Sequence, residues 1–99
     1  MKEIIETSVF KKWLSNLRDR RARIRVLQRL DRLKVGNAGD TKPIGDGLSE
    51  LRIDYGPGYR VYYMQQGSIV VILLCGGTKR DQAKDIATAK ALAQAWREE

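Results

Sequence analysis

The chain has 99 residues, 42% of them apolar and 31% charged, and its 19 Lys or Arg against 12 Asp or Glu give a net charge of +7. We expect this length to form one domain, residues 1–99, with too small a core for a large buried cavity. No segment approaches the roughly 20 apolar residues that cross a bilayer. With no visible signal peptide and a single cysteine, the sequence indicates a cytoplasmic protein.

The chain contains no histidine, which excludes histidine metal sites, Ser-His triads and imidazole general bases. The acidic residues are dispersed and no ligand spacing recurs, so we expect neither a metal nor another cofactor. Cys75 lies in an apolar run without an activating neighbour, so we expect a buried structural role for it.

The positive charge is concentrated at one end of the chain. The first 35 residues carry 11 Lys or Arg and four Asp or Glu, whereas residues 36–99 carry eight of each. Charge gathered on one element indicates a polyanion as partner, and a nucleic acid is favoured because arginine neutralises phosphates. A membrane surface is the competing partner, but it would need a large apolar face with aromatic residues beside the basic one.

A short strand and a helix are predicted first. The strand covers residues 2–6, and Thr7 or Ser8 can then cap a helix by accepting a hydrogen bond from a free backbone N–H. The helix has apolar residues at the spacing i, i+3, i+4 and i+7, which places them on one face. They are Phe10, Trp13, Leu14 and Leu17.

A second helix is predicted from the capping residue Asp19 to Val35, forming a helical hairpin with the first. Its apolar stripe is Ile24, Leu27 and Leu30, flanked by Val26 and Leu33. The opposite side carries an arginine ridge, which comprises Arg18, Arg21, Arg25, Arg29 and Arg32. Two interpretations stay open: a solvated face, or a docking surface for RNA. Only Asp31 is acidic between Arg20 and Lys34, which weakens the first, since solvent-facing helices tend to alternate charge.

The second half of the chain predicts a surface loop, three strands and a helix. The loop covers residues 36–47, the strands cover residues 48–55, 59–65 and 68–75, and the helix runs to about Arg97 after a capping box at residues 78–81. The order β-α-α-β-β-β-α indicates an α+β fold. We expect an antiparallel sheet packed by the N-terminal helical hairpin and the C-terminal helix.

Four basic residues are candidates for a phosphate-binding cluster. Alternation places Arg52 and Arg60 on neighbouring strands, and Lys79 and Arg80 follow the last strand at a helix N-terminus, where an anion is favoured. If they converge, they can stabilise the charge that develops when a ribose 2′-OH attacks its own phosphate. The alternative is that Arg52, Asp54 and Arg60 form cross-strand ion pairs.

Two glycine-rich segments carry a family resemblance: Gly56–Arg60 (GPGYR) and Gly76–Arg80 (GGTKR). Together with Leu51-Arg52-Ile53, Val61-Tyr62-Tyr63, Leu73-Leu74-Cys75, Asp85-Ile86 and Ala89, they resemble the RelE/ParE toxin superfamily. The chain is most similar to its HigB-like or phage Gp49-like branch of addiction-module killer proteins. The resemblance covers nearly the whole chain, including the order of elements.

The resemblance implies a type II toxin neutralised by an antitoxin protein, often one with a helix-turn-helix domain. RelE-like members enter the ribosomal A site and cleave mRNA without a metal. By motif, Arg60 and Arg80 match the family's basic residues, Lys79 precedes Arg80 as in the family, and Arg52 lies near a further basic position. Tyr62, on the face of Arg60, is added as an RNA contact.

The chain departs from the family in its last helix, where many RNA-cleaving members carry Tyr or His. It has Lys84, Asp85 and Ile86 there instead. Lys84, Asp81 and Tyr62 are therefore the candidates for proton transfer. The departure leaves open a ParE-like toxin that poisons DNA gyrase, and a non-toxic nucleic-acid-binding module is a third possibility.

The final helix also presents Leu92 and Trp96 on a face otherwise made of alanine. A segment of the antitoxin would cover them, or both would pack on the sheet. The sequence does not choose between these two interpretations.

Overall fold

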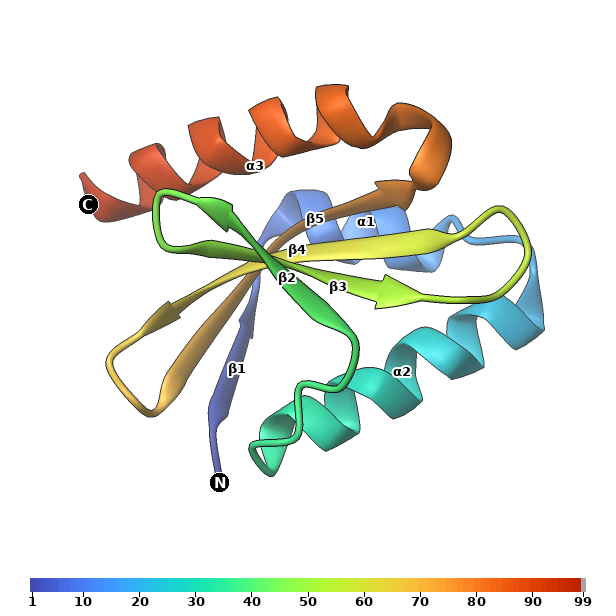
Figure 1. Cartoon of the computed structure of the whole chain (residues 1–99), viewed down its shortest axis with the longest axis horizontal. Helices are drawn as coiled ribbons and strands as arrows, with labels where there is room; N and C mark the ends of the chain where they lie inside the picture. The colour runs from blue at the N-terminus through green and yellow to red at the C-terminus, as the bar shows by residue number, and fades with distance from the viewer. Residues whose placement is uncertain (99) are drawn as a thin grey trace.

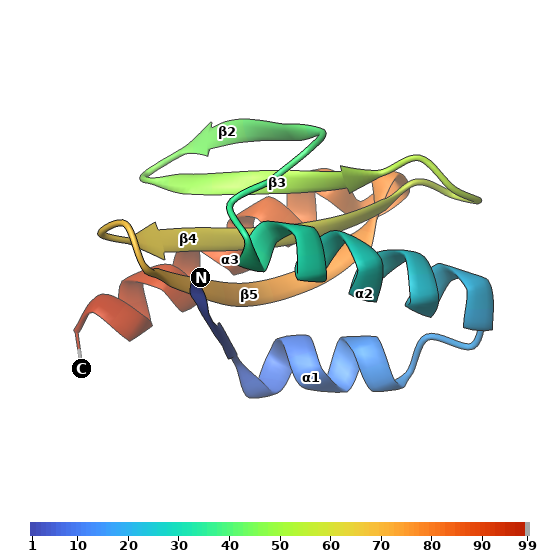
Figure 2. The same ribbon diagram turned by 90° about the horizontal axis from the view of Figure 1, so that it is seen from below.

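The computed structural model describes residues 1–98 as a five-stranded sheet with helices on both faces (Figures 1 and 2). This arrangement confirms the α+β class. In chain order the elements are β1 (Glu3–Glu6), α1 (Ser8–Ser15), α2 (Arg20–Lys34), β2 (Thr41–Gly45), β3 (Leu48–Ile53), β4 (Tyr59–Gln66), β5 (Val70–Thr78), the 3-10 helix η1 (Lys79–Asp81) and α3 (Gln82–Arg97).

The strands are arranged in the order β1-β5-β4-β3-β2. Strands β2 to β5 form an antiparallel meander, but β1 pairs with β5 in parallel, so the prediction of an antiparallel sheet is wrong for this strand. The predicted loop over residues 36–47 is also wrong in part, because residues 41–45 form the edge strand β2. An edge strand tolerates Pro43, which has no N–H to donate.

Helices α1 and α2 cover one face of the sheet (Figure 2). Both N-caps predicted from the sequence are confirmed. The Thr7 hydroxyl accepts from the N–H of Phe10 at 3.1 Å, and the Asp19 carboxylate accepts from the N–H groups of Arg21 and Ala22 at 3.0 and 3.2 Å. Phe10 is fully buried in this apolar core.

The predicted apolar stripe of α2 is wrong at two positions. Ile24 and Leu27 are 47% and 44% exposed, and the helix buries a neighbouring line instead. Arg29 donates to the carbonyl of Arg52 in β3, and Arg25 lies over the ring of Tyr55, just after β3. These contacts of the arginine side of α2 leave Ile24 and Leu27 facing solvent. The buried residues of α2 are Ala22, Val26, Leu30 and Leu33.

Helix α3 covers the other face; Ala89 and Ala93 are its fully buried residues, and Ile86, Leu92 and Trp96 pack beside them partly buried. The predicted capping box at residues 78–81 is wrong: the chain makes the 3-10 helix η1 first, and neither the Thr78 nor the Asp81 side chain caps a helix. A bulge in β5 opposite Tyr62 turns the two consecutive residues Leu74 and Cys75 towards α3.

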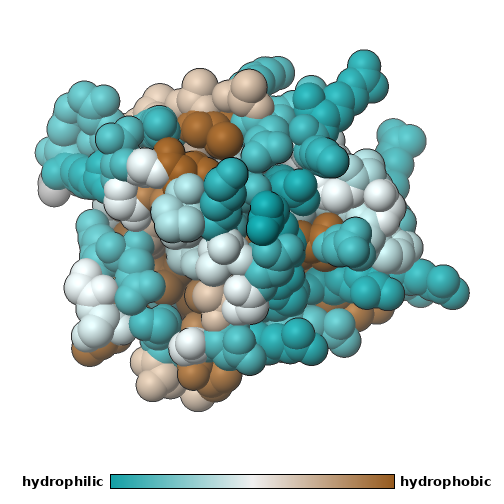
Figure 3. All heavy atoms as spheres, viewed as in Figure 1, coloured by the Kyte–Doolittle hydropathy of each residue, from teal (hydrophilic) through white to brown (hydrophobic). Residues whose placement is uncertain are grey.

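Figure 3 shows the face on which β2 lies nearest the viewer in Figure 1. This face is mainly hydrophilic, with small apolar areas, including one along α3. No helix within residues 1–98 is both long enough and apolar enough to span a membrane.

Candidate functional site

A cleft of about 360 Å³ lies where the loop after β3 returns to β4. Arg52 of β3, Arg60 of β4 and Lys79 of η1 line it together with the turn Gly56-Pro57-Gly58. The carboxylates of Asp40 and Asp54 are also part of the lining. The sheet thus brings three of the four predicted phosphate-binding residues to one place. Arg80 is exposed in η1 and is not part of the lining.

The strand register and the turn position these basic side chains. Arg52 lies directly opposite Arg60 in the β3–β4 ladder. Gly58 has a φ of +81° and accepts a hydrogen bond from the Lys79 N–H at 2.8 Å. A Cβ atom on Gly58 would lie 3.4 Å from both Arg60 Nη1 and Lys79 Cβ, so glycine lets the turn lie against them.

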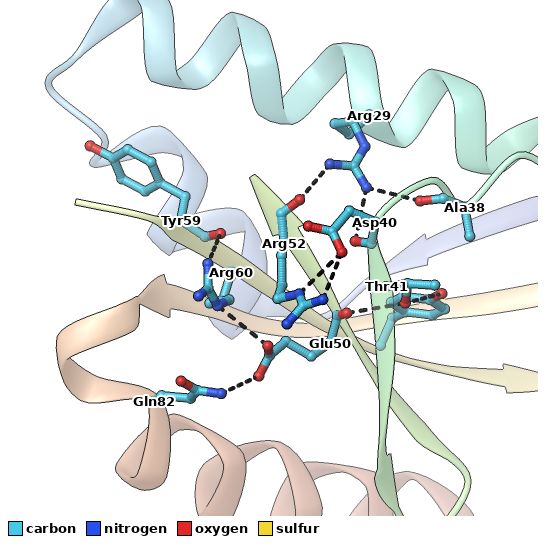
Figure 4. Close-up of polar contacts among 10 residues, drawn as sticks. Arg29, Ala38, Asp40, Thr41, Glu50, Arg52, Tyr59, Arg60 and Gln82 are labelled. Carbon is cyan, nitrogen blue, oxygen red and sulfur yellow. Dashed lines mark hydrogen bonds and ion pairs between the residues drawn. The ribbon is translucent and has the colours of Figure 1, made fainter. Parts of the chain in front are cut away.

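Each of the two opposed arginines has its own carboxylate (Figure 4). Arg52 donates to Asp40 Oδ1 through Nη2 at 2.8 Å and through Nε at 3.2 Å. Arg60 Nε lies 3.3 Å from Glu50 Oε1. Two cations directly across a ladder repel each other, and the separate carboxylates offset this repulsion. Both arginines are therefore ion-paired, but not as the alternative expected: Asp54 is in neither pair, and the partner of Arg52 is Asp40, which lies outside the strands.

Glu50 also belongs to this cluster, although no motif of the sequence predicts it as a site residue. Its side chain is buried and its Oε2 accepts a hydrogen bond from Gln82 Nε2 at 2.7 Å (Figure 4). The alternation of β3 already places Glu50 on the face of Arg52. A sequence pattern could have predicted it: an acidic residue two positions before one arginine, on a strand that pairs with the strand of a second arginine.

Tyr62 is fully buried under α3, and its hydroxyl has no hydrogen-bond partner within residues 1–98. Burial, followed by the negative charge of Glu50, raises the pKa of this hydroxyl well above its ordinary value. The predicted RNA contact and proton-transfer role of Tyr62 do not agree with this placement. The other two candidates, Lys84 and Asp81, are exposed near the start of α3.

The arginine ridge is not uniform. Arg18, Arg21 and Arg32 are exposed, and the Arg25 guanidinium lies 4.7 Å from the centre of the Tyr55 ring. Arg29 instead ties α2 to the sheet by donating to the carbonyl oxygens of three residues. They are Arg52, Ala38 at 2.9 Å and Asp40 at 3.1 Å.

The ridge and the cleft adjoin. A second hollow of about 150 Å³ is lined by Arg25, Arg29 and Arg32 together with Asp54, and Asp54 also lines the cleft. A polyanion lying across both hollows would therefore meet basic side chains from α2 and from the sheet.

Three further residues singled out from the sequence lie on or under α3. Leu92 and Trp96 are half-buried and pack against the apolar cluster between α3 and the sheet, and their contact with an antitoxin stays a prediction. Cys75 is buried, which raises the pKa of its thiol to about 12 and agrees with a structural role.

A family model described as phage derived protein Gp49-like matches residues 12–95. The chain therefore belongs to this family of addiction-module killer and RelE-like toxins, which confirms the resemblance drawn from its motifs. A protein of Haemophilus influenzae, described as uncharacterized, is 52% identical over 92 residues that cover 93% of each chain.

Proposed function

We propose that the protein is the toxin of a type II toxin-antitoxin system, has the RelE-like arrangement of elements, and cleaves mRNA on the ribosome without a metal. The observation that carries the proposal is the cleft in which Arg52, Arg60 and Lys79 meet, in a chain that belongs to a family of toxins. Three cations from separate elements suit a single phosphate of an RNA backbone.

In the proposed reaction the 2′-oxygen attacks the adjacent phosphorus and the bond from phosphorus to the 5′-oxygen breaks. The 2′-OH loses a proton and the leaving oxygen gains one, which gives a 2′,3′-cyclic phosphate and a 5′-OH. Arg60 and Lys79 stabilise the charge on the phosphate oxygens. Lys84 and Asp81 are the exposed groups that we propose for proton transfer, and Arg80 is a further cation beside them.

Three exposed arginines, two of α2 and one just before it, have a different role in this proposal. Arg18, Arg21 and Arg32 would dock on ribosomal RNA, while the cleft holds the message. Support comes from the hollow beside the cleft, which Arg32 lines together with Arg25 and Arg29. Such docking depends on counterion release, so it should weaken steeply as salt rises.

We expect Arg60→Ala and Arg80→Ala to relieve growth arrest, because each should lower mRNA cutting at the ribosomal A site by about a hundredfold or more. Primer extension on translated messages measures the cuts. Lys11→Ala, which removes an exposed cation of α1 on the opposite side of the sheet, is the control and should cut like the parent. Equal cutting by all four proteins would reject the nuclease assignment.

A gyrase poison is the second candidate. One observation favours it: Arg52 and Arg60 are already paired with carboxylates, as structural ion pairs are. This candidate predicts uncut mRNA together with inhibited supercoiling or trapped cleavage complexes. Salt-sensitive RNA binding without any growth phenotype would instead identify a non-toxic binding module.

The proposed partner for neutralisation is an antitoxin with a helix-turn-helix domain. Leu92 and Trp96 are the proposed contacts, because both are only half-buried on α3. Replacing Leu92 and Trp96 by alanine should reduce antitoxin pulldown more than it reduces thermal stability if the contact exists. The opposite ratio would assign both residues to packing on the sheet.

A further inference from the structure

Glu50 is the charged side chain that is buried within residues 1–98, with an exposed fraction of 1%. Burying a carboxylate costs several kcal/mol unless cations and donors surround it. An apolar residue at this position of β3 would avoid that cost. The carboxylate is therefore expected to act on a neighbouring group.

The neighbours of Glu50 come from the cleft and from α3. Arg60 Nε lies 3.3 Å from its Oε1, and Gln82 Nε2 donates to its Oε2 at 2.7 Å (Figure 4). Neither Oε1 nor Arg60 Nε has a hydrogen-bond partner within the described residues, so the ion pair is what offsets the burial of these two atoms. Glu50 thus connects the cleft arginine to the first residue of α3.

Glu50 contacts Arg60 through the Nε atom, so the terminal nitrogens of the guanidinium remain at the cleft. Nη1 donates to the Tyr59 carbonyl at 3.3 Å and lies against Gly58, a residue of the cleft wall. Arg52, directly across the ladder, would repel an unrestrained Arg60 guanidinium. A carboxylate behind Arg60 therefore fixes the side on which its Nη groups stand.

The second ion pair of the site differs in burial. The side chains of Arg52 and Asp40 are 37% and 54% exposed, whereas those of Arg60 and Glu50 are 12% and 1% exposed. Exposed pairs contribute little and exchange readily with other ions. A buried pair that is also held by Gln82 has no comparable freedom.

We propose that Glu50 is a positioning residue, which holds Arg60 so that its terminal nitrogens face a phosphate bound in the cleft. This inference rests on the proposed function. It predicts a change in anion binding opposite in sign to the change that charge alone would cause. Removing a negative charge beside an anion site should tighten anion binding, whereas releasing Arg60 should weaken it.

The test measures binding of a labelled, single-stranded 2′-O-methyl RNA, which cannot undergo attack by its 2′-oxygen, by fluorescence anisotropy. Glu50→Gln keeps the shape and removes the charge, and it is expected to weaken binding about fivefold or more. Asp40→Asn is the matched control at the exposed pair, and it should bind as tightly as the parent or more tightly. In an Arg60→Ala background, Glu50→Gln should have no further effect.

Tighter binding by Glu50→Gln, or an equal loss in the Arg60→Ala background, would overturn the positioning role and leave the proposed function intact. A parent that does not bind the RNA, or binds it as well with Arg60→Ala, would instead reject the proposed function. Thermal unfolding shows whether Glu50→Gln is folded at the assay temperature. If Glu50→Gln is unfolded, Gln82→Met takes its place, since it removes the donor to Glu50 and should weaken binding about twofold. Unchanged binding by Gln82→Met would count against the inference.

Discussion

The two faces of the sheet are covered in different ways. On the face of α1 and α2, helices with side-chain caps bury large apolar residues such as Phe10 and Val26. On the face of α3, a helix without a side-chain cap buries alanines. Five buried side-chain polar atoms lack a hydrogen-bond partner within residues 1–98, and four of them belong to residues packed on the α3 face. These residues are Glu50, Arg60, Tyr62 and Asp85.

The difference indicates a division between stability and function. Apolar burial and local capping stabilise the first face, since both are favourable without a ligand. Buried polar atoms without partners lower stability, so they persist where they serve a site. The basic cleft lies at the end of the α3 face, next to Glu50 and Gln82.

The largest expected effect comes from two neighbouring leucines of β5 that point to opposite faces. Leu73 and Leu74 are both fully buried, Leu73 under α1 and α2 and Leu74 under α3. We expect Leu73→Ala to lower the free energy of unfolding by about 4 kcal/mol and Leu74→Ala by about 2.5 kcal/mol, because the alanine-packed layer can close over a cavity more easily. Urea unfolding measures both, and equal losses would remove the contrast in packing.

Two consecutive glycines of β5, Gly76 and Gly77, test the same difference between the two faces, with stability effects of intermediate size. A Cβ atom on Gly76 would lie 2.4 Å from the Trp13 ring, and one on Gly77 would lie 1.8 Å from Asp85 Oδ2. We expect Gly76→Ala to cost about 3 kcal/mol, since a ring packed on Phe10 cannot move aside. Gly77→Ala should cost about 1 kcal/mol, because a carboxylate can swing away.

Thermal unfolding of the two glycine variants, of Asp85→Ala and of the two double variants tests the explanation for the glycines. The cost of Gly77→Ala should disappear in an Asp85→Ala background, which removes the clashing carboxylate. The cost of Gly76→Ala should be the same in both backgrounds. Any rescue of Gly76→Ala by Asp85→Ala would show that the two glycines share one obstacle.

The elements that depend on local patterns could be predicted from the sequence. Thr7 and Asp19 cap the helices as expected, because capping needs only a side chain and the next turn. The strand β2 was missed, because Pro43 and the flanking glycines hide a strand that is tolerated only at a sheet edge. The side of α2 that faces the core depends on tertiary contacts, so Ile24 was placed wrongly.

The candidate site shows the same limit. Alternation and the Gly56-Pro57-Gly58 turn predict that Arg52 and Arg60 lie close together. Alternation also places Glu50 and Tyr62 on the face of these arginines, but it does not say how far α3 extends over that face. The cover by α3 buries Tyr62 and leaves the arginines at an open cleft. The roles of both residues therefore required the structure.

The smallest expected effect concerns the cost of polar burial under α3. Asp85 Oδ2 is buried against Gly77 without a hydrogen-bond partner in the described part of the chain. Burial, followed by the charge of Asp81, raises the pKa of the Asp85 carboxyl above its ordinary value of 3.8. The folded protein then holds this proton to a higher pH than the unfolded chain does. Its stability therefore falls as pH rises from 3.8 through the raised pKa.

Asp85→Asn removes the titrating group and therefore also the fall in stability that accompanies rising pH. The variant should match the parent at a pH below 3.8 and exceed it at neutral pH by about 1 kcal/mol, the low end of the cost of an unpaired buried polar group. Thermal unfolding at several pH values measures the difference. Asp31→Asn, at an exposed position of α2, controls for the loss of one negative charge from a basic protein. A gain for Asp31→Asn as large as that for Asp85→Asn would show that net charge, and not burial under α3, sets the stability of this face.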